Sequence, residues 1–337
     1  MNRFKRLGIY FPLLILFTLA SVILRSVALF KNSIFGSGYF SDERLITIAN
    51  ILVLCGCVIL FTFIFISPKI KVVARFDSPN TYIPSGIVAT AMVFLSSELA
   101  IMLAKKPGKL LSAETLFSKN NCLLILTGLC ALVCVGYFIF SALFTRKEDE
   151  ARALFGILVT VFLALYASYL YFDKKLPINS PNKLVDQTAF LMTAIFFLFE
   201  TRISLGREKW RGYCAFGMIA SLITAYSSIP TLIHYFAGGE LASDSLSGAV
   251  LALSLFIYIT ARVLSVNTLK EQTVSDTTLA IKMLMNKRQS ELELPEASRT
   301  HEDDSSFTTL GKNYEFDIRL SEHEGERVEE ESEEQSE

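Results

Sequence analysis

Four polar residues lie inside long apolar segments of this 337-residue chain, close to one end of a segment in each case: Arg25, Asn50, Glu98 and His234. A charge at the centre of a bilayer costs at least ~2.5 to 3.5 kcal/mol, so each charge requires a partner or a role. If the segments cross a membrane in turn, all four residues lie near its outer surface. We predict a buried ion pair between Arg25 and Glu98 with Asn50 as a hydrogen-bond partner. The alternative is that Arg25 snorkels to the headgroups and Glu98 faces interfacial water.

A second group of charges lies near the opposite, inner surface. Glu200 and Arg262 are at similar depth, and Glu200 is predicted to neutralise Arg262. Arg202 is two positions beyond Glu200 and turned away around the helix, so it can reach the inner headgroups. We interpret the three as an anchor that fixes helix register; a gate or an ion path is the alternative.

The segment 213–236 carries small and hydroxyl-bearing residues at alternating steps of three and four, namely Cys214, Gly217, Ser221, Thr224, Ser228, Thr231 and Tyr235. This spacing places them on one helix face. The face is either a seam where helices approach closely or a hydrophilic lining. Pro230 favours a lining, because its missing N–H frees a carbonyl one turn earlier. We predict an outward-facing polar pocket between the first, third and seventh segments, lined by Arg25, Asn50, Glu98, Ser221, Thr224, Ser228 and His234.

The sequence contains no recognisable motif for catalysis or for cofactor binding. All six cysteines lie in or beside apolar segments and are predicted to pack; Cys130 and Cys134 share a helix face, but zinc would require further ligands nearby. His234 is the single histidine of the membrane part, so a two-histidine metalloprotease motif is excluded. Nucleotide-binding loops and serine-nucleophile elbows do not occur. We therefore predict no catalytic residues, no metal and no cofactor.

The elements that must position these residues are eight apolar segments in a chain that is 52% hydrophobic and 19% charged. About 20 apolar residues span a bilayer as a helix, and the segments cover residues 9–30, 46–67, 84–104, 122–144, 153–172, 187–205, 213–236 and 247–267. They lack the alternating polarity of a transmembrane β-barrel. We predict an all-α polytopic bundle over residues 1–270, embedded in a lipid bilayer.

Orientation follows from the basic residues of the short loops. With the N-terminus inside, the inner segments hold 12 Lys and Arg residues and the outer loops hold nine. This excess favours an orientation in a cell membrane that leaves both termini in the cytoplasm. The start of the chain also resembles a signal peptide with a cleavage site at Ser26-Val27-Ala28, although its apolar run is too long and Arg25 stands beside that site.

The last part of the chain differs sharply in charge, because residues 268–337 hold 8 basic and 19 acidic residues. Such a segment cannot bury enough apolar surface to offset the entropy of ordering. We predict a largely disordered acidic cytoplasmic tail over residues 271–337, with a short amphipathic helix at 275–289. The tail could bind a cytoplasmic protein partner, whereas its charge would repel nucleic acid.

Three functions fit these observations. The first is a non-enzymatic membrane scaffold, sensor or interaction protein, since the intramembrane charges are few and are explicable as anchors. The second is a small-solute or ion transporter or channel that uses the polar pocket. The third is a membrane-embedded enzyme that acts on lipid-linked substrates with Glu98 or His234 as acid or base. The companion residues that such catalysis needs are missing from the sequence.

Overall fold

The computed structural model describes residues 7–34, 37–66, 82–104, 119–143, 149–173, 175–205, 210–239 and 245–268. Within this part the chain forms eight α-helices: α1 (Leu7–Asn32), α2 (Arg44–Ile66), α3 (Tyr82–Ala104), α5 (Lys119–Leu143), α6 (Asp149–Phe172), α7 (Pro181–Ser204), α8 (Trp210–Phe236) and α9 (Leu246–Thr268). Each is long and apolar enough to cross a membrane, which confirms the predicted all-α bundle. The predicted tail and its helix at 275–289 lie outside the described residues.

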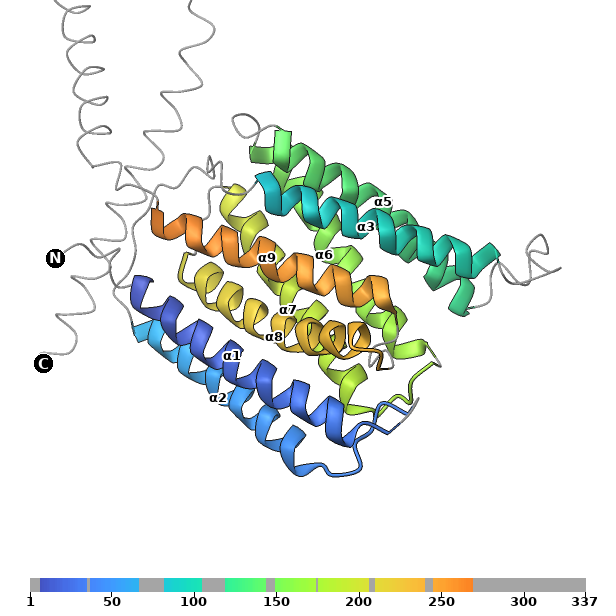
Figure 1. Cartoon of the computed structure of the whole chain (residues 1–337). Helices are drawn as coiled ribbons and strands as arrows, with labels where there is room; N and C mark the ends of the chain where they lie inside the picture. The colour runs from blue at the N-terminus through green and yellow to red at the C-terminus, as the bar shows by residue number, and fades with distance from the viewer. Residues whose placement is uncertain are drawn as a thin grey trace, which may run out of the picture. The chain divides into compact units, whose positions relative to one another are not determined.

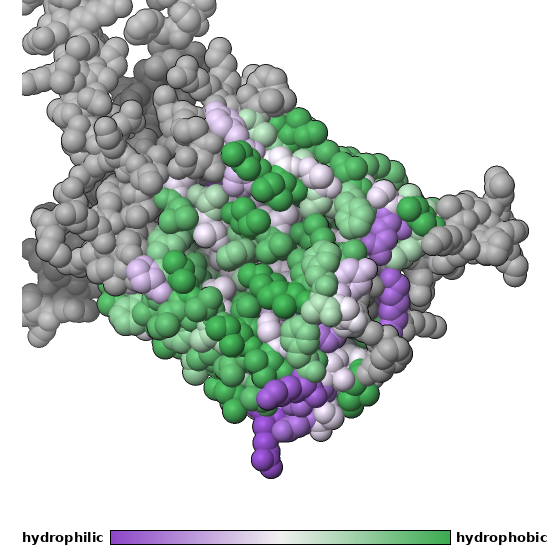
Figure 2. Space-filling view, viewed as in Figure 1, coloured by the Kyte–Doolittle hydropathy of each residue, from purple (hydrophilic) through white to green (hydrophobic). Residues whose placement is uncertain are grey.

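Apolar side chains cover the outer surface of the helices. On α1, for example, Ile15, Leu16 and Leu19 are each about 60% exposed. Figure 2 shows a broad hydrophobic surface over the bundle, with strongly hydrophilic residues gathered at the lower right of this face. Exposed apolar area of this extent is unfavourable in water and favourable in hydrocarbon. The structure is therefore that of a multi-pass helical membrane protein.

Helix α8 is the most buried of the eight described helices. Within its most apolar window 83% of the residues are buried, against 28% for α1 and for α2. It packs against α1, α2, α7 and α9, as Figure 1 shows for its neighbours α1 and α9. Small residues allow these close approaches: a Cβ added at Gly217 would lie 2.5 Å from Val263 of α9. The small residues of segment 213–236 therefore lie on a helix that is surrounded by protein.

Six of the helices close a ring in chain order. Each helix from α3 to α8 packs against its successor along the chain, and α9 returns to pack against α3. The hairpin of α1 and α2 lies outside this ring, against α8. Because consecutive helices run antiparallel, the C-terminal end of α1 and the N-terminal ends of α7 and α9 lie at the same end of the bundle. We name this the Arg25 end, and the opposite one the Glu200 end.

The observed helix boundaries follow the predicted segments closely except at one place. Helix α7 begins at Pro181, whereas the apolar pattern predicted a start at residue 187. Ser180 caps the helix, its side chain accepting a hydrogen bond from the Lys183 N–H, and Pro181 occupies the first turn. Cap and proline together are a strong helix-start signal. The early start places Asn182, Lys183 and Asp186 inside the bundle rather than in a loop.

Candidate functional site

Arg25 is fully buried at the Arg25 end, where it joins α1 to two other helices. Its Nη1 donates to the backbone carbonyl of Tyr226 at 2.9 Å, and its Nη2 donates to Asn182 Oδ1 at 3.2 Å. The guanidinium also lies 4.7 Å from the centre of the Tyr226 ring. Arg25 therefore does not snorkel, and it links α1, α7 and α8 through charge-assisted hydrogen bonds and a cation–π contact.

Pro230 explains why Arg25 finds a backbone acceptor inside α8. A proline within a helix has no N–H, so the carbonyl four residues earlier loses its helical partner. Here that carbonyl belongs to Tyr226, and it is the one that accepts from Arg25 Nη1. The freed carbonyl predicted from the sequence is thus satisfied by a side chain from another helix, as membrane burial requires.

Asn50 joins this network through a tyrosine rather than through Arg25. The hydroxyl of Tyr226 donates to Asn50 Oδ1 at 2.6 Å, which links α8 to α2. Together Arg25, Asn50, Asn182 and Tyr226 form what we call the Arg25 cluster. The sequence analysis included Arg25 and Asn50 in its pocket and missed the other two residues.

Two further buried charges lie on α7 near this cluster. Lys183 is fully buried, and its Nζ donates to the backbone carbonyls of Leu176, at 3.1 Å, and of Asp173. Asp186 is 3% exposed and accepts from the Ser227 hydroxyl at 2.5 Å. Both residues fell in a predicted loop, although the Ser180-Pro181 start signal could have placed them in the helix.

Arg25 and Glu98 do not form the predicted ion pair. Glu98 Oε2 instead accepts from the backbone N–H of Ser247 at 3.3 Å, in the first turn of α9. A carboxylate at a helix N-terminus is favourable, because it meets both unsatisfied N–H groups and the positive end of the helix dipole. The helix arrangement explains the separation: α1 packs against α2 and α8, whereas α3 packs against α5 and α9.

His234 lies at the same end and contacts an aromatic ring of α1. Its ring is half-buried and meets the edge of Phe30 on α1, with the ring centres 5.1 Å apart. The backbone of Gly239 lies against the His234 ring, because a Cβ added at Gly239 would overlap the imidazole. The structure therefore places His234 in an aromatic contact between α8 and α1.

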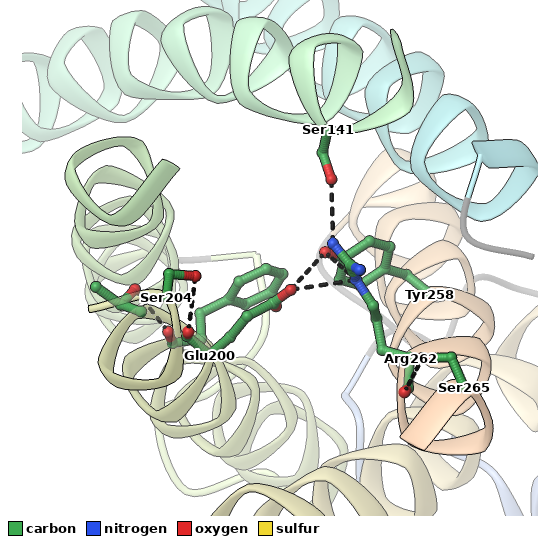
Figure 3. Close-up of polar contacts among 8 residues, drawn as sticks. Ser141, Glu200, Ser204, Tyr258, Arg262 and Ser265 are labelled. Carbon is green, nitrogen blue, oxygen red and sulfur yellow. Dashed lines mark hydrogen bonds and ion pairs between the residues drawn. The ribbon is translucent and has the colours of Figure 1, made fainter. Parts of the chain in front are cut away.

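At the Glu200 end the predicted neutralisation of Arg262 by Glu200 is confirmed. Arg262 Nε lies 3.2 Å from Glu200 Oε1, and the two side chains are 1% and 2% exposed. Tyr258 contacts both, donating to Glu200 Oε1 at 3.1 Å and accepting from Arg262 Nε at 3.0 Å. Arg262 Nη2 donates to Ser141 at 3.2 Å, so the guanidinium stands between α5 and α7 (Figure 3). We call Ser141, Glu200, Tyr258 and Arg262 the Glu200 cluster.

Arg202 takes a different position from its two predicted companions. It is half-buried and its side chain does not join the Glu200 cluster. This agrees with a helix rotation of about 200° between positions two apart. Its predicted contact with headgroups stays a prediction.

Aromatic side chains fill the ring of helices next to the Glu200 cluster. Phe138 of α5 meets Phe197 of α7 at 5.8 Å and Tyr258 of α9 at 5.4 Å between ring centres, both edge-on. Phe197 and Tyr258 stack at 5.7 Å, which completes the triangle across the ring. All three are fully buried. Aromatic pairs of this geometry add roughly 0.5 to 1.5 kcal/mol each beyond area burial.

The hydroxyl face of α8 makes contacts within the protein. Ser221 accepts from Thr260 of α9 at 3.2 Å, while Thr224 and Ser228 donate to carbonyls of their own helix. All three are buried. These contacts agree with a packing seam, and water access along this face stays a prediction.

The structure also has an apolar groove on the side of α3 and α9. A groove of about 460 Å³ lies between α3 and α9, lined by Ile87, Thr90, Ala91, Phe94, Val250, Leu253, Ser254 and Ile257. Its lining is almost wholly apolar, unlike the predicted pocket. Among the residues that the structure describes, His, Cys, Asp and Glu form no cluster suited to a metal ion.

Fold and clusters together define a multi-pass helical membrane protein with buried polar contacts at both ends of its bundle. Comparison with known proteins adds no closer identification. No protein-family model, curated protein or solved structure matches this chain.

Proposed function

We propose that this protein is a non-enzymatic membrane scaffold or sensor whose bundle does not conduct solutes. The observation that supports this most is the buried triangle of Phe138, Phe197 and Tyr258, which fills the interior next to the Glu200 cluster. A transport pathway requires water or substrate to reach the middle of the membrane. In this bundle the polar side chains instead join helices to one another, as anchors do.

A small-solute or ion transporter is the second candidate. The run of buried hydroxyl groups on α8 favours it, because Ser221, Thr224 and Ser228 would line a path if the neighbouring helices separated. The two candidates differ in whether water reaches these positions.

Cysteine labelling separates the two functions. In a background with all six native cysteines replaced by alanine, single cysteines at Ser221, Thr224 and Ser228 are treated with a membrane-impermeant maleimide in proteoliposomes. We expect all three to stay unlabelled, because a dry interior disfavours the reactive thiolate. Ser41→Cys, in the exposed connection between α1 and α2, is the positive control. Rapid labelling of any buried position would contradict the scaffold proposal and favour transport.

We further propose that the protein resides in a cell membrane with both termini in the cytoplasm, where its acidic tail meets a protein partner. The bias of basic loop residues supports this orientation, as the charge of residues 268–337 supports a solvated tail. An epitope added after Glu337 should be protected from antibody and protease on intact cells and become accessible after permeabilisation. Exposure on intact cells would reverse the orientation.

A further inference from the structure

Arg25 and Lys183 are buried cations without a contacting carboxylate in the part of the chain that the structure describes. Both are fully buried, and neither forms an ion pair with any described residue. The opposite end of the bundle offers a direct contrast, because Arg262 there lies 3.2 Å from Glu200. A buried charge without a contacting counter-ion is costly in a low-dielectric interior, so an anion in contact with Arg25 would stabilise this end.

Two hydrogen-bond donors at this end also lack a partner among the described residues. They are Arg25 Nε and Asn182 Nδ2, and both belong to residues that are no more than 1% exposed. The two side chains are already in contact, since Arg25 Nη2 donates to Asn182 Oδ1 at 3.2 Å. A buried donor without an acceptor loses its full hydration energy. One acceptor placed beside this contact would satisfy both groups.

The backbone at this position favours an anion as well. Asn182 lies in the first turn of α7, immediately after the Ser180 cap and Pro181, where the helix dipole is positive. Asp186, one turn further along α7, is engaged by the hydroxyl of Ser227. Positive potential at the contact of Arg25 with Asn182 therefore comes from Arg25, Lys183 and the start of α7, whereas the Asp186 and Glu98 carboxylates at this end oppose it.

We propose that the Arg25 end binds one small monovalent inorganic anion of halide size, held by Arg25 Nε and Asn182 Nδ2. Lys183 and the N-terminus of α7 strengthen its binding through their positive potential. The burial of both donor residues favours a free ion over the phosphate of a lipid headgroup, which would have to enter from the surface. An ordered water could satisfy the same donors but would bring no negative charge into contact with Arg25. The site goes beyond the proposed scaffold or sensor role and does not depend on it.

The test uses the full chain in phosphatidylcholine nanodiscs. We expect chloride to raise the melting temperature in a saturable manner relative to gluconate at equal ionic strength, since a ligand that binds only the folded state stabilises it. We also expect saturable binding of radioactive ³⁶Cl⁻ to the wild-type protein. Asn182→Asp places a carboxylate beside Arg25 and should weaken ³⁶Cl⁻ binding at least about tenfold. It should also make the melting temperature in gluconate equal to that in chloride.

Asn32→Asp, the same chemical change at the end of α1, is the matched control and should retain the chloride effect. Equal melting temperatures of the wild-type protein in both salts, without ³⁶Cl⁻ binding, would overturn the proposal in favour of an ordered water. Stabilisation by added phosphatidylglycerol but not by chloride would overturn it in favour of a lipid phosphate. Because the wild-type binding measurement stands alone, the test holds even if Asn182→Asp fails to fold. If chloride does not bind, the cysteine-labelling result on the scaffold role is unaffected.

Discussion

Replacing Glu200 by glutamine should lower the free energy of unfolding by about 3 to 5 kcal/mol, the usual cost of removing one partner from a buried ion pair. Glutamine keeps the shape of Glu200 and can still accept from Tyr258, so the change isolates the lost charge. Arg262 would then lose the carboxylate 3.2 Å away while keeping its contacts with Tyr258 and Ser141. The measurement is reversible unfolding in mixed micelles, followed by circular dichroism.

A double-mutant cycle identifies the pair as the cause. Arg262→Met should also destabilise, and the double variant should lose clearly less than the two single losses combined, because residues in contact couple by about 0.5 to 3 kcal/mol. Arg202→Met is the matched control. This half-buried arginine lies on α7, the helix of Glu200, but outside the Glu200 cluster, and its replacement should change the unfolding free energy by no more than about 0.5 kcal/mol. Additive losses would refute the stabilising pair, as would an equal loss from Arg202→Met.

Gly217→Ala should destabilise the protein by about 1 to 3 kcal/mol through overpacking between α8 and α9. The added Cβ would lie 2.5 Å from Val263 Cγ2 and 3.1 Å from Phe196 Cε2. Val263 is 1% exposed and β-branched, so it cannot rotate away easily. The loss is measured as the unfolding free energy under the same micelle conditions.

Gly136→Ala provides the control, because a Cβ at this exposed position of α5 meets no atom within 4 Å. It should leave stability unchanged or raise it slightly, since alanine favours helix more than glycine does. Combining Gly217→Ala with Val263→Ala should recover part of the loss. If Gly136→Ala proves as harmful as Gly217→Ala, the loss reflects glycine removal in general and the close-packing explanation fails.

The sequence predicted the membrane helices well because a bilayer imposes a local rule. A helix must present about 20 apolar residues whatever its neighbours are, so each segment could be found without knowledge of the others. The rule failed only for α7, whose first turns carry Asn182, Lys183 and Asp186. These polar residues are buried against protein rather than lipid, and hydropathy alone cannot distinguish the two surroundings. The Ser180-Pro181 helix-start signal was available in the sequence, but the segment predicted from hydropathy began at residue 187.

The sequence predicted the correct ion-pair partner at the Glu200 end but not at the Arg25 end. Glu200 and Arg262 have matching depths and opposite charges, and they lie on helices that meet inside the ring, so the prediction from depth was correct. Arg25 and Glu98 satisfy the same criteria of depth and charge, yet their helices do not pack together and each found a backbone partner. Depth follows from sequence position, whereas lateral distance depends on helix order around the bundle.

The sequence by itself determined that this chain crosses a bilayer as helices and that its buried charges form two groups at different depths. Both are properties of single segments, set by the cost of exposing polar groups to hydrocarbon. The tertiary structure alone decided that α8 lies at the centre, that Arg25 satisfies the Tyr226 carbonyl freed by Pro230, and that Arg25 has no acidic partner among the described residues. These depend on which helix faces touch, which is set by packing between residues far apart in the chain.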